Sequence, residues 1–132
     1  MDTPAGSVEE IEPRIMYFRY QGGMTVEGLE KIISARVALT VEKGYATKEF
    51  VDIFDLRFCY IKHIDVRGLA NIALMEPIPD VSYFVPSADK AIMNNMAQMV
   101  LNFSKQNFIV AHSFDQALEQ SRLRLRNMRF TS

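Results

Sequence analysis

Ile64-Asp65-Val66-Arg67-Gly68-Leu69 is the stretch of this chain that decides its fold. It follows Phe50-Val51-Asp52-Ile53-Phe54-Asp55-Leu56, a run rich in apolar and β-branched residues that predicts a strand. Asp65 is a suitable N-cap residue for a short helix, which Pro77 and Pro79 must end. A strand, a loop and a capped helix in this order predict one βα unit.

The same order of strand and helix occurs three more times along the chain. The expected pairs are a strand over 15–20 with a helix over 25–44, a strand over 81–85 with a helix over 88–104, and a strand over 108–111 with a helix from 114 to about 128. Strands that alternate with helices imply right-handed crossovers between parallel strands. The expected fold class is therefore α/β, with a mostly parallel, four- to five-stranded sheet and about four helices.

Capping residues support two of these helices. Thr25 stands in the N-cap position of the first helix, and Gly44 stands in its C′ position. Ser113 and Gln116 form a capping box at the start of the last helix. The apolar residues of the first helix recur at helical spacing and predict its buried face, namely Val26, Leu29, Ile33, Val37 and Val41.

The length of 132 residues suits a single domain with one core. We assign residues 14–130 to this domain. Residues 1–13 predict an N-terminal tail or a weak edge strand, because Glu9, Glu10 and Glu12 make the segment acidic and Pro13 ends it.

Composition argues against several classes of partner. Hydrophobic residues make up 48% of the chain, and a net charge of −1 gives no overall attraction to nucleic acid or to a membrane surface. No apolar run approaches the ~20 residues of a membrane-spanning helix. Cys59 is the single cysteine, and the chain does not open with the basic and apolar regions of a signal peptide. We therefore expect a cytoplasmic protein.

These elements resemble the STAS domain, which is shared by sulphate transporters and anti-sigma-factor antagonists. In that domain an Asp-Ser-Ser-Gly-Leu-type turn follows a strand and a loop, and residues 51–56 and 64–69 look like this strand and this turn. The similarity continues in 81–87 and 114–118, and Gly22-Gly23-Met24-Thr25 is similar to the helix entry of the bacterial SpoIIAA-like group. The resemblance implies a single STAS-like domain with a non-catalytic regulatory or protein-interaction role and no cofactor.

The turn departs from the STAS pattern at its phosphorylation site. In the antagonists, a kinase phosphorylates the serine before the glycine, and the added negative charge is the switch. This chain has Arg67 at that place and Val66 beside it, and neither side chain can be phosphorylated. We expect a partner-binding surface that is not switched by phosphorylation, formed by Tyr60, Lys62, His63, Asp65, Val66, Arg67 and Gly68. Its cations favour an acidic partner, and the alternative is a solvated loop.

The expected third helix has no charged residue between Ala91 and Ser104. Met93, Ala97 and Leu101 form an apolar flank beside the stripe that suffices for the core. Charge depletion with methionine enrichment is typical of interface cores, so a homodimer or partner contact through this flank is one interpretation. A deeply buried helix with adaptable methionine packing is another. The alternative function is a module that binds a small apolar ligand or lipid.

The sequence shows no catalytic constellation and no metal site. His63 and His112 fall at the ends of expected elements and lack the spacing of metal ligands. Asp52 and Asp55 are separated by an odd number of positions, so they face opposite sides of a strand and cannot form a carboxylate pair. No motif gives Cys59 a catalytic role. We therefore expect that the chain is not an enzyme.

The last helix carries Arg122, Arg126 and Arg129 on one face. Cations near a helix C-terminus interact favourably with its dipole, and Glu119 can pair with Arg122. A nucleic-acid site would need aromatic or wider basic support, which this helix lacks. We interpret the row as a solvated face and expect no nucleic-acid partner.

Overall fold

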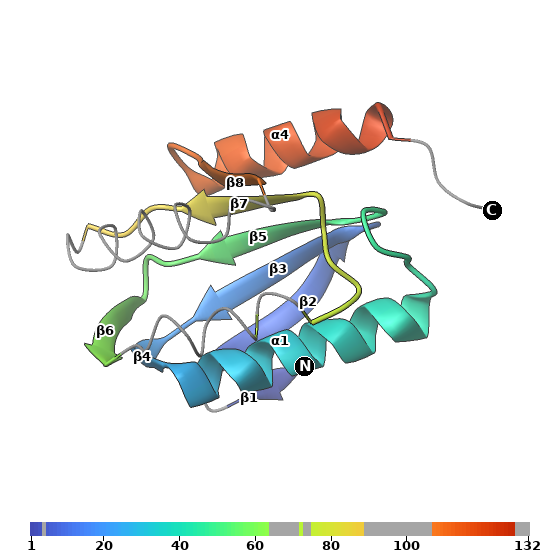
Figure 1. Ribbon diagram of the computed structural model, residues 1–132. Helices are drawn as coiled ribbons and strands as arrows, with labels where there is room; N and C mark the ends of the chain where they lie inside the picture. Colours follow the sequence, from blue (N-terminus) through green and yellow to red (C-terminus); the bar gives the residue numbers. More distant parts are fainter. Residues whose placement is uncertain (4, 64–71, 73–74, 89–106, 129–132) are drawn as a thin grey trace.

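The structure is a computed structural model that describes residues 1–3, 5–63, 72, 75–88 and 107–128. Figure 1 shows a twisted sheet with α1 on one face and α4 on the other. The elements are β1 (Asp2–Thr3), β2 (Gly6–Glu12), β3 (Ile15–Tyr20), β4 (Gly22–Thr25), α1 (Val26–Lys43), β5 (Val51–Asp55), β6 (Cys59–His63), β7 (Val81–Val85), β8 (Asn107–Val110) and α4 (Phe114–Arg126).

The main sheet has six strands in the order β1-β2-β3-β5-β7-β8. The pairs β1–β2 and β2–β3 are antiparallel, and the pairs β3–β5, β5–β7 and β7–β8 are parallel. β4 and β6 form a separate parallel ribbon. The α/β class is confirmed, but the expectation of a mostly parallel, four- to five-stranded sheet was wrong because the sheet is mixed. The described residues contain two helices, and the other two expected helices, after Asp65 and over 88–104, lie largely outside them.

The antiparallel part of the sheet comes from the N-terminal segment. β2 lies between β1 and β3, and its Val8 is fully buried. Arg14 takes a positive φ of 68° in the turn to β3, and its N–H donates to the Glu10 carboxylate over 3.0 Å. Glu10 also accepts a hydrogen bond from the Tyr45 hydroxyl and pairs with Lys43 over 3.5 Å. This acidic residue therefore has partners elsewhere in the chain, and β2 is an interior strand with the short β1 at the edge of the sheet.

The caps of both described helices are those that the sequence predicts. Thr25 accepts a hydrogen bond from an N–H in the first turn of α1 over 3.0 Å, and Gly44 ends α1 in the left-handed conformation with a φ of 75°. Ser113 accepts a hydrogen bond from the N–H of Gln116 over 3.1 Å at the start of α4. Neither α1 nor α4 is long and apolar enough to cross a membrane.

The buried face of α1 matches the expected apolar stripe in part, because Leu29 and Ile33 are buried. However, Val41 is 65% exposed, whereas Arg36 and Thr40 are buried. The Thr40 hydroxyl donates to carbonyl oxygens of the preceding helical turn, and Arg36 pairs with a carboxylate of the sheet. Both polar side chains can therefore be buried, and the helix is rotated relative to the face that apolar spacing predicts.

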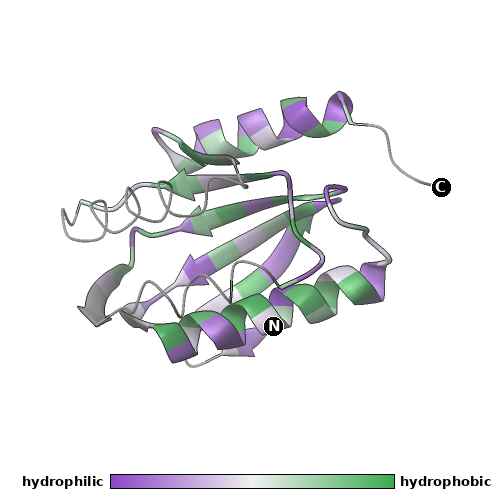
Figure 2. Cartoon of the chain, viewed as in Figure 1, coloured by the Kyte–Doolittle hydropathy of each residue, from purple (hydrophilic) through white to green (hydrophobic). Residues whose placement is uncertain are grey.

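The two faces of the sheet carry different cores. On the α1 face, stacked aromatic rings cross the sheet with neighbouring centroids 4.5–6.2 Å apart. These rings belong to Phe18, Tyr20, Phe54, Phe84 and Phe108. On the α4 face the core is mainly aliphatic and contains Ala117 of α4 together with the strand residues Ile15, Val51, Ile53, Val81 and Val85. Figure 2 shows hydrophobic residues concentrated in the central strands, while polar and apolar residues alternate along α4.

Ion pairs connect α4 to the sheet. Arg122 pairs with Glu12 over 2.8 Å, and Arg124 pairs with Asp80 over 2.7 Å. The arginine row of the last helix is therefore partly engaged with acidic residues of other elements, and Arg122 uses Glu12 as its ion-pair partner. Arg129 lies outside the described residues.

Candidate functional site

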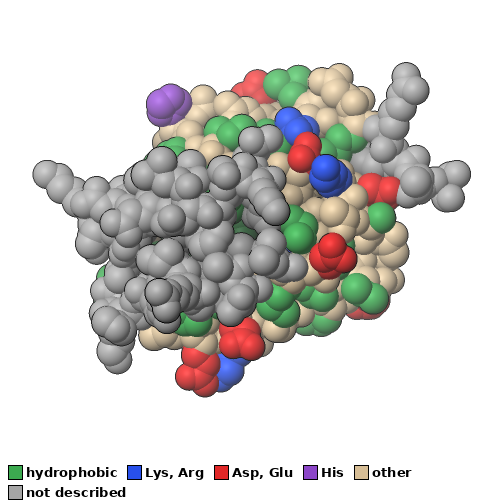
Figure 3. All heavy atoms as spheres, viewed as in Figure 1, with side chains coloured by type: hydrophobic (Ala, Val, Ile, Leu, Met, Phe, Trp, Pro, Cys, Tyr) green, Lys and Arg blue, Asp and Glu red, His purple; other side chains and the backbone are tan. Residues whose placement is uncertain are grey.

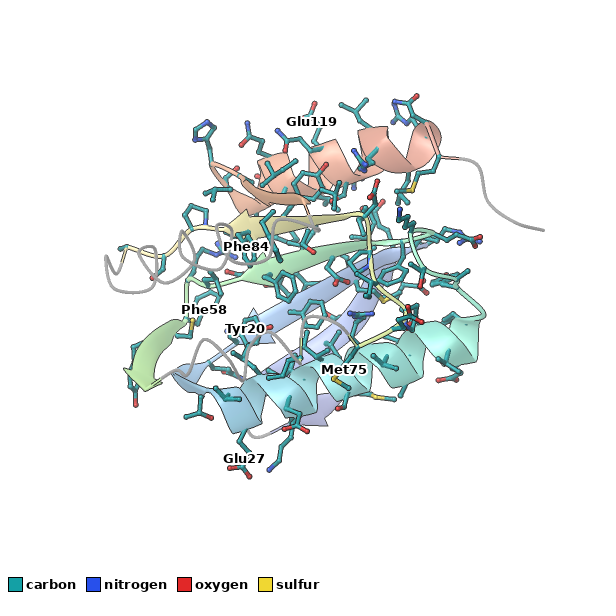
Figure 4. All side chains as sticks on the ribbon, in the orientation of Figure 1. Tyr20, Glu27, Phe58, Met75, Phe84 and Glu119 are labelled. Carbon is teal, nitrogen blue, oxygen red and sulfur yellow. The ribbon has the colours of Figure 1, made fainter. Side chains whose placement is uncertain are left out.

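The carboxyl ends of β3 and β5 meet at one end of the sheet, where α/β folds commonly bind ligands. β5 leads here into Arg57 and Phe58, which precede β6. Figure 4 shows Phe58 at this end of the sheet, beyond the aromatic core that contains Tyr20 and Phe84. Arg19 comes from the adjacent strand, because the β3–β5 register pairs it with Asp55. This end of the sheet therefore joins aromatic and cationic side chains from two strands.

Asp55 is the buried anchor of this site. Its side chain is fully buried and accepts hydrogen bonds from Nε and Nη2 of Arg57 over 2.9 and 2.7 Å. It also accepts a hydrogen bond from the hydroxyl of Tyr17 on β3. Burial by itself would raise the pKa of Asp55, but the hydrogen bonds from Arg57 and Tyr17 outweigh it and hold the pKa below its usual value. Asp55 is thus a carboxylate that fixes the Arg57 guanidinium in one orientation.

Arg19, Arg57 and Phe58 form a cluster that we name the Arg–Phe platform. The guanidinium carbons of Arg19 and Arg57 lie 4.4 and 5.1 Å from the centroid of the Phe58 ring. The ring is 46% exposed, although phenylalanine is usually buried. Cation–π contacts hold the three side chains together at the surface. The platform therefore offers an apolar group beside two positive charges.

The predicted binding residues are only partly described. Tyr60 is 55% exposed and lies on β6, which pairs with β4. The segment from Tyr60 to His63 is therefore a strand rather than the loop that we expected. The backbones of Lys62 and His63 belong to this strand, and their side chains lie outside the description. The remaining predicted residues, Asp65, Val66, Arg67 and Gly68, also lie outside it, as do Met93, Ala97 and Leu101 of the expected dimer or ligand face.

Sequence reasoning did not find the platform. Phe58 was a usable signal, because it follows Arg57 in a short connection, and binding residues are disproportionately found in loops. The participation of Arg19 depends on the register of β3 and β5, which the sequence does not specify. On the face shown in Figure 3, acidic and basic side chains are interspersed, so charge selectivity must come from such local clusters.

Arg36 and Asp52 form a second polar cluster, buried beneath α1. Their side chains are 4% and 2% exposed, and Nε of Arg36 lies 3.6 Å from Oδ2 of Asp52. Arg36 also donates to the carbonyl oxygen of Pro77. Burial raises the pKa of Asp52 to about 6, although the charge of Arg36 opposes the shift. Asp52 and Asp55 thus face opposite sides of the sheet, as their spacing predicts, so the two carboxylates do not form a pair.

Within the described residues, no group of three or more His, Cys, Asp or Glu side chains is arranged to hold a metal ion. The cavity that an apolar-ligand module requires was expected beside residues 91–104, which lie outside the description. The described geometry therefore presents a surface platform on a buried anchor, and its chemistry is that of charge pairing and apolar contact.

Replacing Tyr17 with phenylalanine is expected to lower the free energy of unfolding at pH 7 by about 1.5–3 kcal/mol, the usual value for a hydrogen bond to a charged group. The folded-state pKa of Asp55 is lowered, so its stabilising contribution is present above the unfolded value of 3.8 and is lost as the pH falls through the folded value. The deficit should therefore shrink toward pH 3. Urea unfolding at several pH values measures it, with Tyr83→Phe as the control. A deficit that does not depend on pH contradicts this role of Tyr17.

Comparison with known proteins places the fold but not the function. No family model and no curated protein matches the chain. The crystal structure of an uncharacterised protein of the DUF3478 family with a SpoIIAA-like fold, from Shewanella loihica PV-4, is similar to it, with a TM-score of 0.62. The two chains are 14% identical, and the similarity covers 92% of this chain and 98% of the other. The chain therefore has a SpoIIAA-like α/β fold, as the resemblance to the STAS domain predicts.

Proposed function

We propose that this chain is a non-catalytic protein-interaction domain that binds an acidic segment of a partner protein at the Arg–Phe platform and the adjoining Tyr60. The observation that carries this proposal is the exposed Phe58 ring with a guanidinium group from each of two strands' ends beside it. Arg19 and Arg57 contact the ring, and Asp55 fixes Arg57. A preorganised cluster of this kind loses little side-chain entropy on binding.

The chemistry of the platform specifies what it would bind. Arg and large aromatic side chains are enriched among the residues that dominate binding energy at protein interfaces. Guanidinium groups pair with carboxylates in fixed geometry, and an apolar side chain of the partner can cover the exposed Phe58 ring. Because Asp55 already engages Arg57, the charge of Arg19 is the more available for a carboxylate of the partner. The preferred ligand is therefore an acidic peptide segment that also contains an apolar residue.

The proposal includes regulation that does not depend on phosphorylation of the expected turn. Val66 and Arg67 occupy the positions at which STAS antagonists carry phosphorylatable serine, and neither can accept a phosphate. Lys62, His63 and Arg67 add cationic residues close in sequence to Tyr60. Control of binding would then depend on the abundance or accessibility of the acidic partner.

Selection of binders from a phage-displayed library of random peptides tests the proposal. The selected peptides are expected to be enriched in Asp and Glu and to contain an apolar residue. Their affinity should fall about tenfold or more for Phe58→Ala and for Arg19→Gln. Truncating a residue that dominates an interface costs about 1.4 kcal/mol or more, which corresponds to a tenfold loss of affinity. Val41→Ala and Arg126→Gln are matched controls, because Val41 and Arg126 are also exposed but lie away from the platform.

Two results contradict the proposal. One is a selection without enrichment in acidic residues. The other is an affinity that falls equally in the platform variants and in their matched controls, since binding then takes place elsewhere. Circular dichroism melting of each variant shows whether the fold is retained.

A further inference from the structure

β8 forms one edge of the six-stranded sheet, and half of its backbone groups point away from the sheet. The N–H of Ala111 donates to the carbonyl oxygen of Phe84 on β7. Because backbone groups alternate in direction along a parallel ladder, Ile109 also bonds to β7, while Phe108 and Val110 direct their N–H and C=O groups outward. No hydrogen bond of these outward groups is found with any described residue. Among the described residues nothing pairs with this edge, which can therefore act as a template for another strand.

The side chains of this edge are apolar and accessible. Ile109 is 39% exposed and Val110 is 48% exposed. Because side chains alternate along a strand, Ile109 lies on the α4 face of the sheet and Val110 on the α1 face. Charged side chains and prolines are the usual devices that keep a sheet edge from pairing, and this strand contains neither.

The described helices leave this edge uncovered. α4 packs over β5 and β7, and α1 packs over the N-terminal strands at the other side of the sheet. The open stretch has a defined end, because the N–H of His112 donates to the side chain of Gln116 over 2.6 Å. Phe108 and Val110 are thus the described residues of β8 whose outward backbone groups are available for pairing.

We propose that two copies of this chain associate through antiparallel pairing of their β8 strands, about a two-fold axis that passes beside Ile109. In this register Phe108 of each copy pairs with Val110 of the second copy, and each such pair exchanges two backbone hydrogen bonds. Both outward residues of each strand are then satisfied by roughly four new hydrogen bonds. The two main sheets become one continuous sheet.

The register also brings matching side chains together. The two Ile109 residues form a pair without hydrogen bonds at the axis, where Cα atoms of antiparallel strands are about 4.5 Å apart. On the other face, Phe108 of each copy lies beside Val110 of the second copy, and aromatic side chains pair favourably with β-branched ones across strands. A second copy fits this edge because an uncharged edge meets itself without repulsion. Pairing centred on Val110 would instead require the N–H of His112, which Gln116 already binds.

Sedimentation equilibrium of the full chain from about 10 μM to about 1 mM tests the proposal, since a short sheet-edge contact is at the small end of interface sizes. We expect a reversible dimer. Ile109→Lys places two like charges beside each other at the axis and should raise the dissociation constant about tenfold or more. Leu123→Lys is the matched control, because Leu123 on α4 is 50% exposed and should leave the dissociation constant unchanged.

Cross-linking tests the register and remains informative if Ile109→Lys unfolds. Ile109→Cys should form a disulfide-linked dimer on oxidation with oxidised glutathione, because the Cα separation at the axis suits a disulfide. Leu123→Cys should not, although that position is more exposed. A chain that stays monomeric at about 1 mM overturns the proposal, even if an extended peptide binds the edge. Equal cross-linking at the two positions also overturns it.

Discussion

Replacing Arg36 with methionine is expected to lower the free energy of unfolding at pH 8 by about 3–5 kcal/mol, the usual cost of leaving one partner of a buried ion pair alone. Arg36 is the buried cation beneath α1 that lies 3.6 Å from the Asp52 carboxylate. Methionine fills much of the space of the arginine stem but leaves the carboxylate without a counter-charge. It also removes the hydrogen bond to the Pro77 carbonyl and the contact with the Phe50 ring.

The deficit of Arg36→Met should depend on pH in a defined direction. The folded-state pKa of Asp52 is raised from 3.8 to about 6, so its contribution to stability is complete below pH 3.8 and is lost as the pH rises through about 6. Arg36 is the group that opposes this rise, so its removal should move the folded-state pKa of Asp52 higher still. The difference between the variant and the original chain should therefore be smallest near pH 5 and grow from pH 6 upward.

Urea unfolding at pH 5, 6, 7 and 8 measures this difference. The control is Arg36→Met combined with Asp52→Asn, in which the titrating carboxyl is absent. The double variant can be less stable than the original chain, but its deficit should shrink from pH 5 to pH 8, because only the original chain loses the contribution of Asp52 as the pH rises. A deficit of Arg36→Met that is equal at pH 5 and pH 8 contradicts the assignment of Asp52 as the buried titrating group.

The parts of the fold that depend on local signals could be predicted from the sequence. The caps at Thr25, Gly44 and Ser113 are local features, because each is defined by a side chain or by a backbone conformation within one helical turn. The strand over 81–85 is likewise marked by its own apolar residues and by the proline after it. The opposite facing of Asp52 and Asp55 follows from the period of a strand alone.

The parts that depend on distant partners could not be predicted. The acidic segment over 6–12 looks like a solvated tail until Lys43, Tyr45 and Arg122 are seen to engage its carboxylates. β4 and β6 are marked in sequence as a Gly-Gly turn and a loop, and they become strands because they pair with each other. Arg36 interrupts an apolar stripe, and its burial is possible because Asp52 lies across the interface. Side-chain charge is thus a poor guide to burial where the neutralising partner is far away in sequence.

The candidate site illustrates the same limit. The sequence directed attention to the segment that follows β5, in which Tyr60 is exposed. It did not identify Arg19, which reaches Phe58 because β3 and β5 are neighbours in a parallel sheet. It also treated Asp55 as an ordinary strand residue, although Asp55 holds Arg57 in place. Tertiary pairing therefore decides which of the local cations belong to the platform.

Replacing Gly6 with alanine is expected to lower the free energy of unfolding by about 3 kcal/mol or more, because the added methyl group overlaps the backbone of the neighbouring strand. A Cβ atom at Gly6 would lie 1.9 Å from the carbonyl oxygen of Arg19 and 3.1 Å from the Cα atom of Tyr20. Gly6 also has a positive φ of 149°, which side-chain-bearing residues rarely adopt. Neither obstacle can be relieved by a side-chain rotation, so β2 must move away from β3.

The loss of protection in Gly6→Ala should be largest in β2 itself. Val8, two positions along β2, is fully buried against α1, so displacement of β2 exposes core surface. Amide hydrogen exchange in residues 6–12 should therefore accelerate more than exchange in β5 or β7. Gly22→Ala is the matched control, because Gly22 also has a positive φ, 74°, but no atom lies within 4 Å of an added Cβ. That variant should cost only the conformational strain, about 1 kcal/mol. Equal losses in the two variants would mean that backbone conformation, and not the close approach of β2 to β3, sets the requirement for glycine at position 6.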